Sequence, residues 1–91
     1  MKLISKVKVK NTMGLHTRPA TMIVKMLQNC KSHVFFTYKH DTVNAKSILS
    51  ILMLAATRNS KITITVDGED ADDTMKNLVN AFENHFGESH G

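Results

Sequence analysis

The sequence has little of what marks several common classes of protein. Its single cysteine, Cys30, leaves no intramolecular disulfide to form. No apolar run approaches the roughly 20 residues that a membrane-spanning helix needs, and the first residues lack the continuous apolar block of a signal peptide. Aromatic residues make up 5% of the chain and do not interleave with its basic residues, which disfavours a stacking surface for nucleic acid. We therefore expect a cytoplasmic protein that neither inserts into a membrane nor binds nucleic acid.

What the chain does contain predicts one small folded unit. Its 91 residues are 42% apolar and 22% charged, which is enough for one modest core, and we expect one domain over residues 1–86 with a disordered tail over 87–91. The net charge of +4 comes from lysines spread along the sequence and favours an acidic protein partner. The five histidines are scattered, and no nucleotide-type glycine-rich loop is present, so we expect no metal and no cofactor.

Hydrophobic periodicity predicts seven elements. Alternation with a period of two predicts strands over about 3–10, 33–38, 42–44 and 62–66, with His40 or Asp41 taking a positive φ in the turn between the second and third. Helical spacing predicts helices over 17–27, from Ser47 as N-cap to about residue 56, and from about residue 70 to Phe86. The order β-α-β-β-α-β-α predicts an α+β open-faced sandwich, in which three helices cover one face of a four-stranded antiparallel sheet.

The segment GLHTRPA, residues 14–20, concentrates reactive chemistry where the first helix begins. A helix start offers free amides to an anion, and a neutral imidazole such as that of His16 is a nucleophile. Arg18 adds a permanent cation, Pro19 suits the first helical turn, and Gly14 permits a sharp turn. These features fit a phosphoryl carrier, although from the residues alone a solvated or capping histidine in a binding module is the more common explanation.

Three segments resemble one known family over nearly the whole chain. They are GLHTRPA at 14–20, VNAKSILSILMLAA at 43–56 and ITITVDGED at 62–70, and they are similar to the HPr family, the histidine-containing phosphocarriers of the bacterial phosphotransferase system. The resemblance implies a stoichiometric carrier and not an enzyme, in which Nδ1 of His16 accepts a phosphoryl group from phosphorylated enzyme I and delivers it to an enzyme IIA domain. It also implies that Arg18 assists the phosphate. Ser47 matches the position that HPr kinase modifies in some lineages, and a simple N-cap is an equally good explanation of this serine.

The resemblance also implies a docking face for these partners on a monomer. Its residues are Thr17, Thr21, Lys25, Ile48, Leu49, Leu52 and Met53. Independently, the second helix has more apolar residues than one buried face can use, with Ile51 and Leu54 the better core candidates. Ala55 and Asn59 replace glycines common in the family, and Ala55 tolerates a positive φ less well. Two alternatives stay open: a carrier in a regulatory, nitrogen-type phosphotransferase chain, and a small basic binding module without phosphoryl chemistry.

Overall fold

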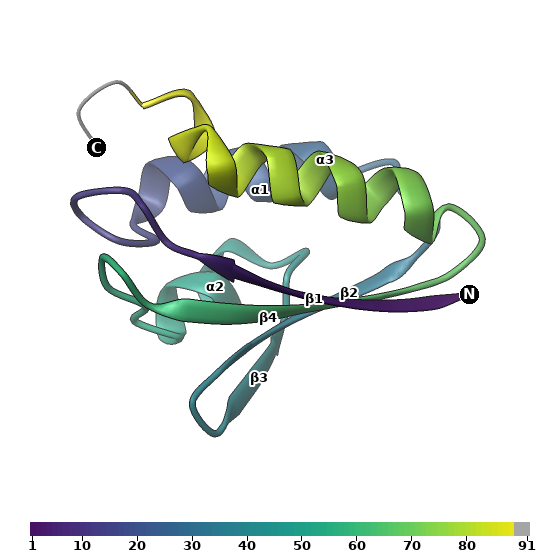
Figure 1. Cartoon of the computed structure of the whole chain (residues 1–91), viewed down its shortest axis with the longest axis horizontal. Coiled ribbons are helices and arrows are strands. Elements are labelled where there is room, and N and C mark those ends of the chain that lie inside the picture. Colours follow the sequence, from purple (N-terminus) through teal and green to yellow (C-terminus); the bar gives the residue numbers. More distant parts are fainter. Residues whose placement is uncertain (89–91) are drawn as a thin grey trace.

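The structure, a computed structural model, describes residues 1–88, and its elements follow the predicted order (Figure 1). They are β1 (Lys2–Lys8), α1 (Thr17–Leu27), β2 (His33–Tyr38), β3 (Asp41–Asn44), α2 (Ile48–Met53), β4 (Lys61–Asp67), α3 (Ala71–Glu83) and a final 3₁₀ turn, η1 (His85–Gly87). Of the predicted tail, Gly87 and Glu88 are described and make hydrogen bonds, while residues 89–91 lie outside the described residues.

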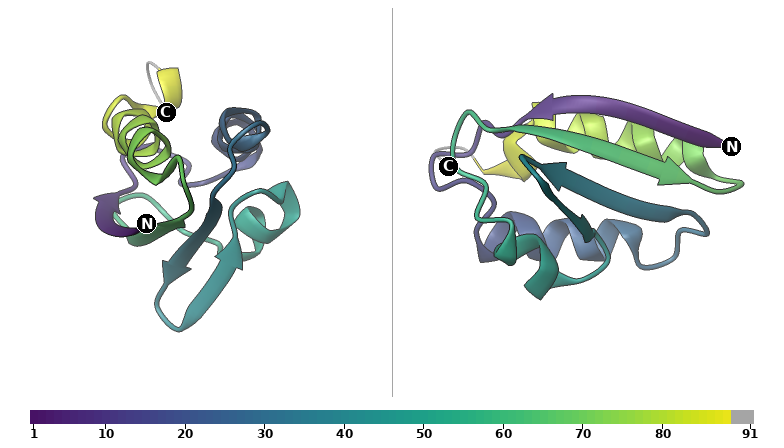
Figure 2. Two further views of the ribbon diagram at one scale, coloured as in Figure 1. Left: turned by 90° about the vertical axis from the view of Figure 1, so that its right-hand side faces the viewer. Right: turned by 90° about the horizontal axis from the view of Figure 1, so that it is seen from below.

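The four strands form one antiparallel sheet in the order β1-β4-β2-β3, and the three helices lie on one side of it (Figure 2). This confirms the predicted open-faced sandwich. The lysine-rich β1 is an edge strand, and its exposed Lys6 and Lys8 lie opposite Thr63 and Lys61 of β4. A row of lysines on an edge discourages pairing with another chain.

The core lies between the sheet and the helices, where the apolar face of the sheet packs against the apolar faces of the helices. Alternate strand residues and one stripe from each helix are buried there: Val7, Val34, Phe36, Ile62, Ile64, Val66, Ala20, Ile23, Leu27, Ile51, Leu78 and Phe82. The rings of Phe36 and Phe82 meet edge to face with centroids 5.7 Å apart. Ile51 and Leu54 are 0% and 4% exposed, which confirms them as core residues. Within residues 1–88, every helix is too short or too polar to cross a bilayer.

Three local features differ from the prediction. The residue with positive φ between β2 and β3 is Lys39 (φ 56°), and neither His40 nor Asp41. The second helix stops at Met53 because Ala55 takes a left-handed conformation (φ 52°), which no α-helix continues through. The third helix stops at Glu83, so the buried Phe86 belongs to η1 and not to α3.

Candidate functional site

The loop before α1 is held against the segment that follows α2. Gly14 has φ +70°, and a Cβ there would lie 2.3 Å from the carbonyl oxygen of Ala56. The next amide, of Leu15, donates to that same oxygen at 3.0 Å, and the Leu15 side chain is 4% exposed. Only glycine fits this approach, so Gly14 fixes the path of the chain through the buried Leu15 to His16, two residues further on.

His16 is the N-cap residue of α1, but its ring does not cap the helix. Its backbone is extended (φ −81°, ψ −169°), its carbonyl accepts the first helical bond from Ala20 at 3.1 Å, and its side chain makes no capping bond. The amides of Thr17 and Arg18 have no acceptor within the helix, Pro19 has no N–H, and the first turn holds no acidic residue. The ring therefore stands, 26% exposed, beside a helix start that favours an anion.

A carboxylate from the C-terminal segment completes this site. Glu88 Oε1 lies 3.2 Å from His16 Nε2, and Glu88 Oε2 lies 3.9 Å from Arg18 Nη1. The Arg18 side chain is 74% exposed, so its guanidinium can reach an anion in solvent as well as this carboxylate. Glu88 could not be predicted as part of this site from the sequence, because no local pattern ties a residue of the predicted tail to one 72 positions earlier.

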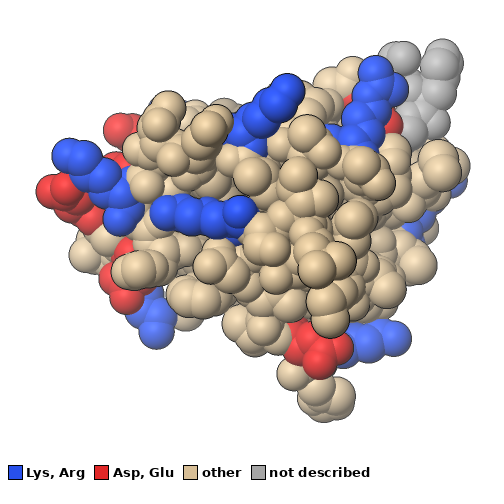
Figure 3. All heavy atoms as spheres, turned by 180° about the vertical axis from the view of Figure 1, so that it is seen from behind, with Lys and Arg blue, Asp and Glu red and all other residues tan. Residues whose placement is uncertain are grey.

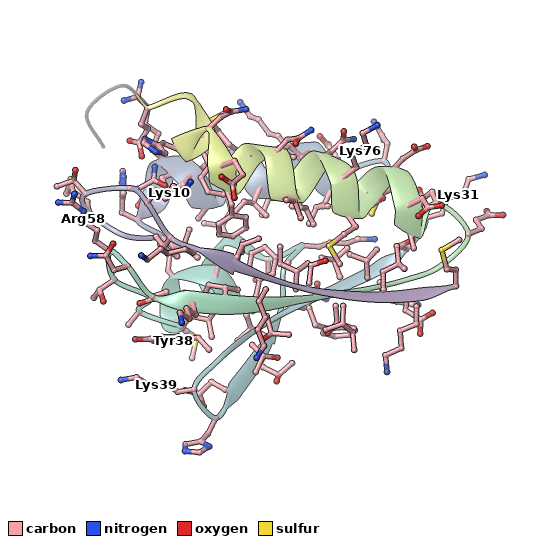
Figure 4. The ribbon with its side chains drawn as sticks, viewed as in Figure 1. Lys10, Lys31, Tyr38, Lys39, Arg58 and Lys76 are labelled. Carbon is pink, nitrogen blue, oxygen red and sulfur yellow. The ribbon has the colours of Figure 1, made fainter. Side chains whose placement is uncertain are left out.

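More basic residues lie at the same end of the molecule. Figure 4 shows Lys10 and Arg58 at the end where the C-terminal segment meets the loop before α1. Lys10 Nζ pairs with Glu83 Oε2 at 2.7 Å, and the hydrogen bond and charge of Lys10 lower the pKa of Glu83. The described residues hold no group of three or more histidine, cysteine, aspartate or glutamate side chains placed to bind a metal ion.

The second candidate region is α2 and the helix beside it. Ser47 is the N-cap of α2 as predicted, since its Oγ accepts from the Ser50 amide at 3.2 Å. On this short helix Leu49 and Met53 are 68% and 73% exposed, and Ile48 is 36% exposed.

The residues predicted to dock a partner lie on α1 and α2, two helices that contact each other. We call this set of residues the α1–α2 surface, and its members are Thr17, Thr21, Lys25, Ile48, Leu49, Leu52 and Met53. Leu52 is half-buried against the core, and Thr21 Oγ1 donates to the Thr17 carbonyl at 2.7 Å. Met22 and Met26 of α1 are also exposed, at 39% and 37%. Figure 3, which views the molecule from behind, shows a broad uncharged area crossed by a few basic side chains, with acidic ones mainly toward its edges.

Comparison with known proteins decides the family. The family model described as "PTS HPr component phosphorylation site" matches residues 4–84. The chain belongs to the HPr family. The phosphocarrier protein HPr of Chlamydia muridarum is 42% identical over 80 residues, which cover 88% of this chain and 77% of that protein. This is the phosphocarrier family of the phosphotransferase system.

Solved HPr structures share the architecture as well. An HPr from Thermoanaerobacter tengcongensis superposes with a TM-score of 0.91 at 31% identity, covering 96% of this chain and 98% of that one. The HPr of Bacillus anthracis str. Ames gives a TM-score of 0.82 at 35% identity, covering 87% of this chain and 94% of the other. Membership of the HPr family therefore rests on sequence and fold together.

Proposed function

We propose that this protein relays a phosphoryl group from enzyme I to enzyme IIA domains of the phosphoenolpyruvate-dependent sugar phosphotransferase system, with His16 Nδ1 as the carrier atom. The observation that carries the proposal is the placement of a partly exposed, non-capping imidazole at the N-cap of α1. A nucleophile there can take a phosphoryl group from one protein and present it to another without a pocket around it.

The surroundings of His16 suit a phosphate that must be held briefly. In the forward step, the Nδ1 lone pair forms a bond to phosphorus while the bond from phosphorus to the donor breaks, and that electron pair stays on the donor. The transferred oxygens then lie near the free amides of Thr17 and Arg18. The Arg18 guanidinium offers several N–H donors, and its exposure lets it follow the phosphate.

The α1–α2 surface is the proposed docking face for both partners, on a monomer in the cytoplasm. Leu49 and Met53 supply apolar area that a partner can bury, and it lies on helices adjoining His16. The net charge of +4 favours encounter with acidic partners. Shared use of one face by enzyme I and enzyme IIA requires complexes that dissociate quickly, because the carrier meets its partners in turn.

The test is phosphorylation by phosphoenolpyruvate and enzyme I. Wild-type protein should take up acid-labile, alkali-stable label from labelled phosphoenolpyruvate, and His16→Ala should take up none. His40→Ala, which removes an exposed histidine in the β2–β3 turn, is the matched control and should label like wild type. No label on the folded wild-type protein would contradict the proposal and favour a binding module.

Ser47 is a second proposed site of phosphorylation, by HPr kinase. Its hydroxyl is occupied as the α2 cap, so the cap alone also explains this serine. A phosphate on Ser47 would place negative charge beside Ile48 and Leu49, where it would repel an acidic partner. Incubation with ATP and an HPr kinase should label wild type and Ser50→Ala but not Ser47→Ala. No label on wild type, when a control HPr is labelled, would leave Ser47 as a cap only.

A further inference from the structure

The C-terminal segment turns back on itself to bring Glu88 to His16. His85, Phe86 and Gly87 all have positive φ, at 55°, 52° and 78°, and the Glu88 amide donates to the His85 carbonyl at 2.9 Å. Phe86 anchors the turn, since it is 2% exposed and packs edge to face on Phe82 with centroids 4.8 Å apart. Left-handed conformations at two consecutive non-glycine residues, His85 and Phe86, are costly, so contacts around the segment must hold this turn.

Asn11 supplies one such contact. Its Nδ2 donates to the His85 carbonyl at 2.9 Å and also to Glu88 Oε1, and the residue is 0% exposed. The Glu88 side chain is 8% exposed, much less than that of either neighbour in the site, His16 or Arg18. The carboxylate is therefore held in place beside a ring that is itself open to solvent.

We propose that Glu88 is a positioning residue for the phosphoryl acceptor, which it orients and whose developing charge it stabilises. The inference rests on the proposed function of His16. An ionised carboxylate can only accept hydrogen bonds, so the 3.2 Å contact requires the proton of the neutral ring to be on Nε2. The other nitrogen, Nδ1, then keeps its lone pair, and the ring is held with that nitrogen turned away from Glu88.

The same contact helps as the phosphoryl group arrives. When the Nδ1 lone pair forms the bond to phosphorus, the His16 ring gains positive charge while the Nε2 proton stays in its hydrogen bond to Glu88. A carboxylate that holds an imidazole by its second nitrogen stabilises this charge, as the buried aspartate of a serine-protease triad does. Because the two ring nitrogens point to different sides, the carboxylate is kept off the side where the phosphate binds.

A contact between Glu88 and Arg18 allows an opposite role, in which Glu88 occupies the site and slows phosphorylation. The geometry favours positioning, because Glu88 Oε1 is closer to His16 than Oε2 is to Arg18, at 3.2 Å against 3.9 Å. The two roles predict opposite effects of removing the side chain. Positioning predicts slower phosphoryl transfer in Glu88→Ala, and inhibition predicts faster transfer.

The first test uses the free protein and needs no phosphotransferase partner. Nitrogen-15 NMR of the His16 ring, at a pH where it is neutral, should show the proton on Nε2 in wild type, with an Nε2–H signal protected from solvent exchange. Glu88→Ala should lose that protection and give a mixture of tautomers. Glu83→Ala, which removes the nearby carboxylate that pairs with Lys10, should leave the ring signals as in wild type. Ring signals unchanged in Glu88→Ala would overturn the inference.

The second test is the rate of phosphorylation by enzyme I. Glu88→Ala should lower kcat by about tenfold with KM nearly unchanged, and Glu88→Gln, which keeps an acceptor without the charge, should fall between it and wild type. A rate equal to or above that of wild type would refute the positioning role. If even wild type takes up no phosphoryl group, the proposed function fails, and the NMR comparison still decides whether Glu88 orients the ring.

Discussion

At the residue scale, the site depends on backbone conformations that most side chains avoid. Gly14, Ala55 and Asn59 all have positive φ, at 70°, 52° and 72°. Their loops are joined to each other and to the end of β1, since the Leu15 amide donates to Ala56 and the Asn59 amide donates to the carbonyl of Val9 at 2.7 Å. The position of His16 is thus set by a small network of turns and not by α1 alone.

Replacing Gly14 tests this dependence. Gly14→Ala should lower the free energy of unfolding by about 2 kcal/mol or more, because a methyl group adds both left-handed strain and a clash 2.3 Å from a backbone oxygen. Gly87→Ala is the matched control, since Gly87 has φ +78° but nothing within 4 Å of a Cβ, so strain alone should cost about 1 kcal/mol. Equal losses in urea unfolding of the two variants would show that the close approach at Gly14 is unimportant.

Ala55 offers the reverse experiment. Ala55→Gly should raise the free energy of unfolding by about 0.5–1 kcal/mol, because relief of left-handed strain exceeds the added entropy of the unfolded chain. Asn59→Gly should gain less, since asparagine tolerates this conformation better than alanine does. Thermal and urea unfolding of both variants would check the order, and a loss of stability in Ala55→Gly would contradict the strain argument.

At the element scale, periodicity predicted most of what the structure contains. Alternating residues such as Ile62, Ile64 and Val66 define a strand and its buried face together, so β4 could be predicted from sequence. The end of α2 could not, because the apolar pattern continues past the point where Ala55 turns left-handed. The contact of Glu88 with His16 could not be predicted either. Those two residues are brought together by tertiary packing, which leaves no local signal in the sequence.

Asp70 shows how one side chain joins two elements. Its carboxylate accepts from the Lys31 amide at 2.7 Å and from Ser32 Oγ, which ties the start of α3 to the connection between α1 and β2. These hydrogen bonds lower the pKa of Asp70, and the bond from the Lys31 amide has the largest effect. A lowered pKa in the folded state means that the stabilisation is complete above the unfolded-state pKa of about 3.9 and is lost as pH falls through the folded value.

Asp70→Asn should therefore lower the free energy of unfolding most near neutral pH. Below pH 4, the free energy of unfolding of this variant should decrease less steeply than that of wild type. The control is Asp73→Asn, which removes a charge from the first turn of the same helix. The Asp73 side chain is not hydrogen-bonded to the connection between α1 and β2, so this variant should change the free energy of unfolding much less. Urea unfolding of both variants between pH 3 and pH 7 would measure the difference. An acid dependence of Asp70→Asn identical to that of wild type would rule out this role for the carboxylate.

At the scale of the whole molecule, the two sides of the sheet differ in what they expose. The helical side carries His16 and the α1–α2 surface, while the open side exposes apolar residues such as Ile4 of β1 and Phe35 of β2, at 61% and 37%. Both lie opposite Thr65 of β4. Exposed apolar area alone therefore does not identify a docking face, because both sides have some. The helical side differs because α2, which exposes Leu49 and Met53, contacts α1, the helix that begins at His16.

Two substitutions of similar exposure test that distinction. Leu49→Gln should raise the KM for phosphorylation by enzyme I about tenfold, because roughly 1.4 kcal/mol of apolar burial in the complex is lost, while stability stays within about 0.5 kcal/mol of wild type. Ile4→Thr keeps a β-branched residue on the open side of the sheet and should leave KM unchanged. If both variants changed KM equally, docking would not be confined to the α1–α2 surface. If neither variant changed KM, the exposed apolar residues of α2 would not contribute to binding enzyme I. The electrostatic attraction of an acidic partner would then have to account for the encounter.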